Sequence, residues 1–208
     1  MIDPGLLLTY ALIVLGFVFI PGPATLLTVA RATTSGTKVG IATGAGITAG
    51  DIVHTIMAVV GISAIIAASA TLFTIVKYLG AAYLVYLGLR AIFDKAQIDL
   101  GQGRVPITAG QAFRQAILAE ILNPKTALFF LAFLPQFVVP ENGLEVLQLT
   151  ILGVIFALIG FLSTIVYSFA AGGLGAFLRR SPAVLKWQGK VVGGIYCALG
   201  LRLALQER

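Results

Sequence analysis

The chain has 208 residues, of which 59% are hydrophobic and only 11% are charged. Soluble domains are roughly 45–50% apolar and about 25% charged, so this composition excludes a soluble globular protein and also a disordered chain. The net charge of +6 has no basic face with which to bind nucleic acid. The single cysteine excludes a disulfide framework and a multi-cysteine metal site.

Six apolar stretches are each long enough to cross a bilayer as a helix, which takes about 20 residues. They are too long for the alternating strands of a membrane barrel. We therefore expect an all-α integral membrane protein with six transmembrane helices, organised as a single membrane transport domain over residues 1–208. The six stretches are 6–30, 40–68, 70–92, 114–138, 146–171 and 184–204.

Basic residues mark one side of this expected membrane domain. The loops after the first, third and fifth stretches are basic, whereas the fourth loop carries Glu141 and Glu145 and no base. Since Lys and Arg are enriched in cytoplasmic loops, the odd loops should be cytoplasmic and both termini outside. The bases in and beside the odd loops are Arg31, Lys38, Arg90, Lys95, Arg104, Arg114, Arg179, Arg180, Lys186 and Lys190.

Two segments of the chain resemble each other. One begins Lys-Tyr-Leu-Gly-Ala-Ala-Tyr at Lys77, and the other begins Lys-Val-Val-Gly-Gly-Ile-Tyr at Lys190. The first and fourth stretches also share a proline within apolar sequence. We therefore expect two repeats of three helices, at about 1–93 and 114–208, joined by a cytoplasmic loop at 94–113. Because three is odd, the second repeat should be inverted, as in many secondary transporters.

Prolines are expected to break the first and fourth spans. The first span contains Pro21-Gly22-Pro23, and the fourth contains Asn123-Pro124. A proline within a helix removes a backbone donor and clashes with the carbonyl four residues before it. Each span should then restart as a half-helix, with Asn123 as an N-cap. Two positive helix ends at membrane depth would suit a carboxylate; the alternative is a pair of kinks that serve only packing.

Four of the ionisable residues inside the expected spans are candidates for function, because a charge at membrane depth is costly. Asp51 and His54 are three residues apart on one helix face, and Glu120 and Lys125 flank the break in span four. We expect Asp51 or Glu120 to bind a substrate ammonium or to carry a proton, because a low-dielectric site favours the neutral carboxyl. The alternatives are a structural Asp51–Lys125 ion pair and a His54 that only packs.

Small residues precede Asp51 on the second span. Gly46 and Gly50 are spaced so that a neighbouring helix can approach closely. This packing would place Asp51 against protein rather than lipid.

Three other functions fit these residues less well than transport. An inorganic ion or metal exporter would need more Asp, Glu, His or Cys ligands than the spans contain. An intramembrane enzyme could use Asp51 and His54 as an acid–base pair, but neither His-x-x-x-His nor Gly-x-Ser-x-Gly occurs. A passive structural protein needs no broken helices. We therefore expect a transporter that is not an enzyme and holds no cofactor or metal.

Several motifs together resemble the lysine-exporter-type (LysE/RhtB) amino-acid efflux family over nearly the whole chain. They are the broken span one, the Gly46 to Asp51 segment, Asn123-Pro124-Lys125, and the downstream Phe129-Phe130 and Phe133-x-Pro135-Gln136-Phe137. The resemblance implies export of amino acids or related metabolites across the bacterial inner membrane, thought to use the proton gradient. It implies a site at Pro21, Gly22, Pro23, Asp51, Asn123, Pro124 and Lys125.

The resemblance does not identify the substrate, and it carries no role for His54 or Glu120. A homodimer is plausible from the family and from the glycine-rich helix faces. The expected mechanism is proton-linked export of a small zwitterionic solute. Its carboxylate would meet the two half-helix N-termini and Lys125, and its ammonium would meet Asp51 or Glu120, while the two repeats rock about the site.

Overall fold

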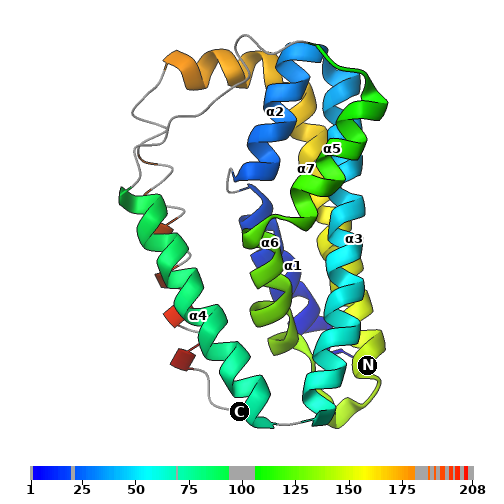
Figure 1. Ribbon diagram of the computed structural model, residues 1–208, viewed down its shortest axis with the longest axis vertical. Coiled ribbons are helices and arrows are strands. Elements are labelled where there is room, and N and C mark those ends of the chain that lie inside the picture. Colours follow the sequence, from blue (N-terminus) through cyan, green and yellow to red (C-terminus); the bar gives the residue numbers. More distant parts are fainter. Residues whose placement is uncertain are drawn as a thin grey trace.

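Every regular element in the described part of this computed structural model is a helix (Figure 1). The structure describes residues 2–19, 22–68, 70–93 and 106–180, with scattered positions between 187 and 205. The α-helices are α1 (Pro4–Phe19), α2 (Pro23–Ser35), α3 (Thr37–Ala68), α4 (Ala70–Phe93), α5 (Ala109–Ile121), α6 (Pro124–Leu128) and α7 (Glu145–Arg180). A π-helical turn η1 (Phe129–Phe133) and two 3₁₀ turns, η2 (Leu134–Phe137) and η3 (Pro140–Asn142), follow α6.

Two helical segments, Thr37–Gly61 and Glu145–Ala171, are long and apolar enough to cross a bilayer alone. Two bent helix pairs raise the number of candidate spans in the described part to four, if each pair is one span. The all-helical membrane class is therefore supported, and α4 coincides with the expected third span. The sixth expected span, 184–204, lies largely outside the described residues, so the six-helix repeat stays a prediction.

Both helix breaks fall at the prolines. α1 ends at Phe19 and α2 begins at Pro23, with a bend of 53° between them. α5 ends at Ile121, and the helical segment that begins at Pro124 is bent from α5 by 46°. Pro21 itself lies outside the described residues. The expected breaks of spans one and four are thus present, and they lie near each other at mid-height of the bundle (Figure 1).

Helix α3 packs against α2, α5 and α7, and glycines let its neighbours approach (Figure 1). A Cβ at Gly46 would lie 2.3 Å from the Phe113 carbonyl oxygen, and one at Gly50 would lie 2.6 Å from Glu120 Cβ. On another side, a Cβ at Gly44 would lie 2.1 Å from Thr164 Oγ1. Any side chain at these positions would push α5 or α7 away from α3.

Aromatic side chains fill the part of the bundle between the two helix breaks and the end at which α1 begins. We call this group the ring cluster; neighbouring rings lie 4.6–6.3 Å apart, the usual range for packed aromatic pairs. Most of its rings come from the π-turn and the 3₁₀ turn after α6. The ring cluster comprises Tyr10, Phe17, Phe129, Phe130, Phe133, Phe137 and Phe156.

The outward faces of the helices are apolar and the two ends of the bundle differ in charge. Large aliphatic side chains such as Leu12, Leu158 and Leu162 are more than half exposed, as expected of surfaces that face lipid. Lys38 lies where α2 joins α3, whereas Glu141 lies at the opposite end, where α7 begins (Figure 1). The exposed Lys38 and the exposed Glu141 are thus separated along the bundle axis.

The contact between α3 and α5 predicts unequal effects of two alanine substitutions. Gly46→Ala should lower the free energy of unfolding by about 1–3 kcal/mol, because its methyl group would collide with backbone. The matched control is Gly61→Ala on the same helix, where nothing lies within 4 Å of the added Cβ; it should be neutral or slightly stabilising. Thermal unfolding in detergent compares the two variants, and equal stability would contradict this packing.

Candidate functional site

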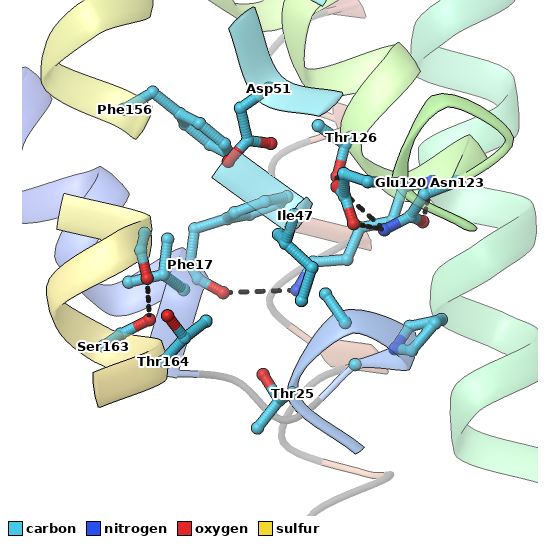
Figure 2. Close-up of a pocket in the computed structure, with 16 residues that line it drawn as sticks. Phe17, Thr25, Ile47, Asp51, Glu120, Asn123, Thr126, Phe156, Ser163 and Thr164 are labelled. Carbon is cyan, nitrogen blue, oxygen red and sulfur yellow. Dashed lines mark hydrogen bonds between the residues drawn. The ribbon is translucent and has the colours of Figure 1, made fainter. Parts of the chain in front are cut away.

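A small cavity of about 40 Å³ lies between the two helix breaks (Figure 2). Since one water needs roughly 10–15 Å³ of such volume, the cavity holds only a few waters in this state and no amino acid. Six helices meet around it, namely α1, α2, α3, α5, α6 and α7. Its lining includes Phe17, Val18, Gly22, Pro23, Ala24, Thr25, Ile47, Asp51, Glu120, Asn123, Lys125, Thr126, Phe156, Gly160, Ser163 and Thr164.

The prolines explain why particular polar side chains gather here. Proline has no N–H, so the carbonyl four residues before it loses its usual helical donor. For Pro21 this carbonyl belongs to Phe17, and the Lys125 ammonium donates to it at 3.2 Å. The ammonium also lies 4.2 Å from the centre of the Phe17 ring, a cation–π contact. Lys125 therefore supplies the hydrogen bond that Pro21 cannot.

The second proline of the first break is compensated in the same way. Pro23 removes the donor of the Phe19 carbonyl, and the Tyr167 hydroxyl on α7 donates to that oxygen at 2.9 Å. The two rings also contact each other, with centroids 5.7 Å apart. Tyr167 thus ties the end of α1 to α7.

The second break has an equivalent donor on α3. Pro124 cannot donate to the Glu120 carbonyl, which accepts instead from the Asn123 backbone N–H at 2.9 Å. His54 Nε2 lies 2.9 Å from the same oxygen. Because a carbonyl only accepts, Nε2 must carry the proton. The imidazole stacks on Phe130 with centroids 5.8 Å apart. His54 therefore lies behind the cavity wall and supports the break, which is a different place from the substrate site expected for it.

The Glu120 carboxylate organises the restart of the fourth span (Figure 2). It is 3% exposed, and each of its oxygens accepts a hydrogen bond at 3.2 Å from the Asn123 amide. The Thr126 hydroxyl donates to one of them as well. Asn123 Oδ1 in turn accepts from the Lys125 backbone N–H at 3.1 Å and caps α6. Glu120 is thus occupied by its own helix restart.

Asp51 differs from Glu120, because one of its carboxyl oxygens accepts no hydrogen bond from the described residues. The residue is 2% exposed, and its Oδ1 has no hydrogen-bond partner among the described residues. The carboxyl group faces the cavity opposite Gly160 of α7, where a Cβ would lie 3.5 Å from Oδ2. A buried carboxyl oxygen without a donor is costly. It therefore marks a place for a proton or a cationic ligand, and the expected ion pair with Lys125 stays a prediction.

The two restarted helices present unequal N-termini to the cavity. The N-cap of α6 is filled by the Asn123 side chain, whereas α2 begins at Gly22 without a side-chain cap. Gly22, Ala24 and Thr25 line the cavity, and a Cβ at Gly22 would lie 3.2 Å from Lys125 Nζ. The α2 terminus and the Lys125 ammonium therefore form one electropositive edge, opposite the acidic wall at Asp51.

The structure brings most of the expected site residues to one place. Gly22, Pro23, Asp51, Glu120, Asn123 and Lys125 line the cavity, and Gly46 and Gly50 bring α5 against α3 beside it. Pro124 instead lines a larger apolar cavity of about 450 Å³ between α6 and α4. The sequence interpretation missed Tyr167 and Thr126. The signal for Tyr167 is the carbonyl four residues before each proline, which needs a donor. An intramembrane tyrosine hydroxyl can supply that donor.

Comparisons with known proteins agree on the class of membrane protein. A family model described as LysE type translocator matches residues 15–207. An uncharacterized membrane protein of Vibrio cholerae is 30% identical over 197 residues, covering 95% of each chain. The uncharacterized membrane protein YrhP of Bacillus subtilis is 34% identical over 208 residues, covering 96% of this chain and 98% of YrhP.

One similar protein carries a functional name. The homoserine/homoserine lactone efflux protein of Salmonella typhimurium is 29% identical over 184 residues, covering 88% of each chain. No solved structure matches this chain.

The Asn123 network predicts a graded loss of stability. Asn123→Ala removes both the α6 cap and a donor to the buried Glu120 carboxylate, so it should lower the free energy of unfolding by about 2 kcal/mol. Asn123→Ser keeps a capping oxygen and should lose less. Chemical unfolding in detergent measures both, and an Asn123→Ser variant as unstable as Asn123→Ala would show that the cap contributes little.

Proposed function

Because the chain belongs to the LysE-type translocator family, we propose that it exports an amino acid or a closely related small zwitterion across the bacterial inner membrane, in exchange for a proton. The efflux activity in the name of the Salmonella protein supports an amino-acid exporter.

The open oxygen of Asp51 is the observation that carries this proposal. It lies at the cavity wall without a hydrogen-bond donor among the described residues. A substrate ammonium would supply that donor and also neutralise the buried charge. Glu120 is a poorer candidate, because its oxygens already accept from Asn123 and Thr126.

The carboxylate of the same substrate fits the opposite edge of the cavity. The uncapped start of α2 offers backbone N–H groups and the positive end of a helix dipole, beside Lys125. A molecule that carries both charges can satisfy both walls at once. This arrangement favours a zwitterion over a simple cation or anion.

We expect exchange with a proton because the proton and the substrate ammonium would compete for the same unpartnered oxygen, Asp51 Oδ1. A proton and an ammonium group both neutralise Asp51, but they compete for the same place. On the cytoplasmic side, the ammonium would displace the proton. On the outer side, a proton would displace the ammonium and release the substrate. One zwitterion then leaves for each proton that enters, which makes export depend on the pH gradient.

The central test is substrate efflux from vesicles that carry the Asp51→Asn variant. The amide is isosteric but cannot be charged, so export should fall at least tenfold and lose its dependence on the pH gradient. Glu141→Gln, an exposed carboxylate at the end of the bundle, is the matched control and should export at the wild-type rate. Asp51→Asn export with wild-type rate and pH dependence would rule out coupling through Asp51.

A second prediction concerns orientation, for which the separated charges are the argument. In a Cys197→Ser background, the exposed positions Lys38→Cys and Glu141→Cys lie at opposite ends of the bundle. In intact cells, an impermeant thiol reagent should label Glu141→Cys and leave Lys38→Cys unlabelled. The reverse pattern would place both termini in the cytoplasm.

A further inference from the structure

The contacts between α3 and α7 repeat after a fixed interval in the sequence. A Cβ at Gly40 would lie 2.7 Å from Ser168 Oγ, and a Cβ at Gly153 would lie 2.3 Å from Thr55 Cγ2. Gly153 follows Gly40 by 113 residues, and Ser168 follows Thr55 by the same interval (168 − 55 = 113). Exchanging the two helices therefore turns one contact into the other, as a two-fold axis between antiparallel helices requires.

The same interval appears in two other places. It separates Lys77 from Lys190, which begin the two similar segments of sequence (190 − 77 = 113). The interval of 113 residues also separates Ile47 from Gly160 (160 − 47 = 113). Both of these residues line the small cavity between the two helix breaks. The axis between α3 and α7 thus passes beside the cavity, where an inverted-repeat transporter has its site.

His54 and Tyr167 are a matched pair under this relation (167 − 54 = 113). Each donates at 2.9 Å to the carbonyl that a proline of the other half has left without its helical donor. His54 lies seven residues beyond Ile47 on α3, and Tyr167 lies seven residues beyond Gly160 on α7. Each also lies only three residues beyond a lining residue of its own helix, Asp51 for His54 and Thr164 for Tyr167. At 1.5 Å per residue, each is about 4.5 Å past that residue, in opposite directions because the helices are antiparallel.

We propose that His54 and Tyr167 are paired positioning residues, each of which closes one side of the cavity. Tyr167 ties the first break to α7 on the Lys38 side, and His54 ties the second break to α3 on the Glu141 side. In this structure both bonds are made. Release of the Tyr167 bond opens the cavity to the Lys38 face, and release of the His54 bond opens it to the Glu141 face.

Water can replace the hydrogen bonds of His54 and Tyr167, because the side of the cavity that opens becomes accessible to water. A carbonyl that loses its donor in lipid stays unsatisfied, but one that faces a water-filled path is hydrated. The Phe19 and Glu120 carbonyls therefore lose little when the side that they close becomes wet. The proposal rests on the transport role of the cavity, but its test requires no substrate.

The test measures access to a cysteine placed in the cavity wall. Ser163→Cys, at a buried residue that lines the cavity, is made in a Cys197→Ser background. A positively charged, impermeant methanethiosulfonate is applied to intact cells and to inside-out vesicles, with Lys38→Cys and Glu141→Cys identifying the two faces. Tyr167→Phe removes only the hydroxyl, and His54→Phe keeps a ring against Phe130 while removing the donor.

Each variant should speed labelling from one face only. Tyr167→Phe should speed it about tenfold from the Lys38 face, and His54→Phe similarly from the Glu141 face, which is the change that one lost hydrogen bond produces in an opening equilibrium. His54→Gln, which keeps a donor, and Tyr86→Phe, at an exposed tyrosine on α4, should label like the parent. The double variant should label faster from both faces.

Other outcomes would overturn the proposal. Unchanged labelling in both variants would mean that the two bonds do not hold the cavity closed. Equal acceleration from both faces would mean that they stabilise the bundle in general, without control of one side. Because labelling is independent of export, a one-sided effect would stand even if Asp51→Asn exported normally, and the failure of either proposal could be recognised separately.

Discussion

The structure depends on the need to satisfy every backbone carbonyl inside a membrane. Three prolines remove the helical donors of Phe17, Phe19 and Glu120, and side chains from the opposite half of the chain replace them. In lipid, each unsatisfied carbonyl would cost several kcal/mol. Contacts between the two halves therefore stabilise the breaks, and at the second break the Glu120 carbonyl also accepts from the Asn123 backbone N–H. The same requirement brings a lysine, a histidine and a tyrosine to membrane depth, where each would otherwise be expensive.

Much of this could be predicted from the sequence, because prolines and apolar runs act locally. The breaks before Pro23 and Pro124 and the Asn123 cap follow from backbone chemistry alone. The partners of the broken ends could not be predicted, because these contacts join residues that are far apart in the chain and depend on how helices cross. His54 is the clearest case: its spacing puts it on the same helix face as Asp51, and the sequence does not reveal that its ring lies against a carbonyl on α5.

The two buried carboxyl groups illustrate the same limit. Asp51 and Glu120 are equivalent candidates in the sequence, since both are acidic and both lie in apolar runs. Their surroundings separate them, because Glu120 is three residues before an asparagine that turns back onto it, whereas Asp51 faces α7 across Gly160. Hydrogen-bond partners, more than burial, distinguish the two roles.

The ring cluster also has an electrical consequence. The hydrophobic core that contains it extends from Phe17 and Phe156 at the cavity to Ile2 near the start of the chain, and such a tightly packed apolar layer has a low dielectric constant. Much of the transmembrane voltage should therefore fall across this layer. An elementary charge that crosses the whole potential gains about 2.3 kcal/mol per 100 mV. A proton that reaches Asp51 from outside would thus collect much of that energy before any helix moves.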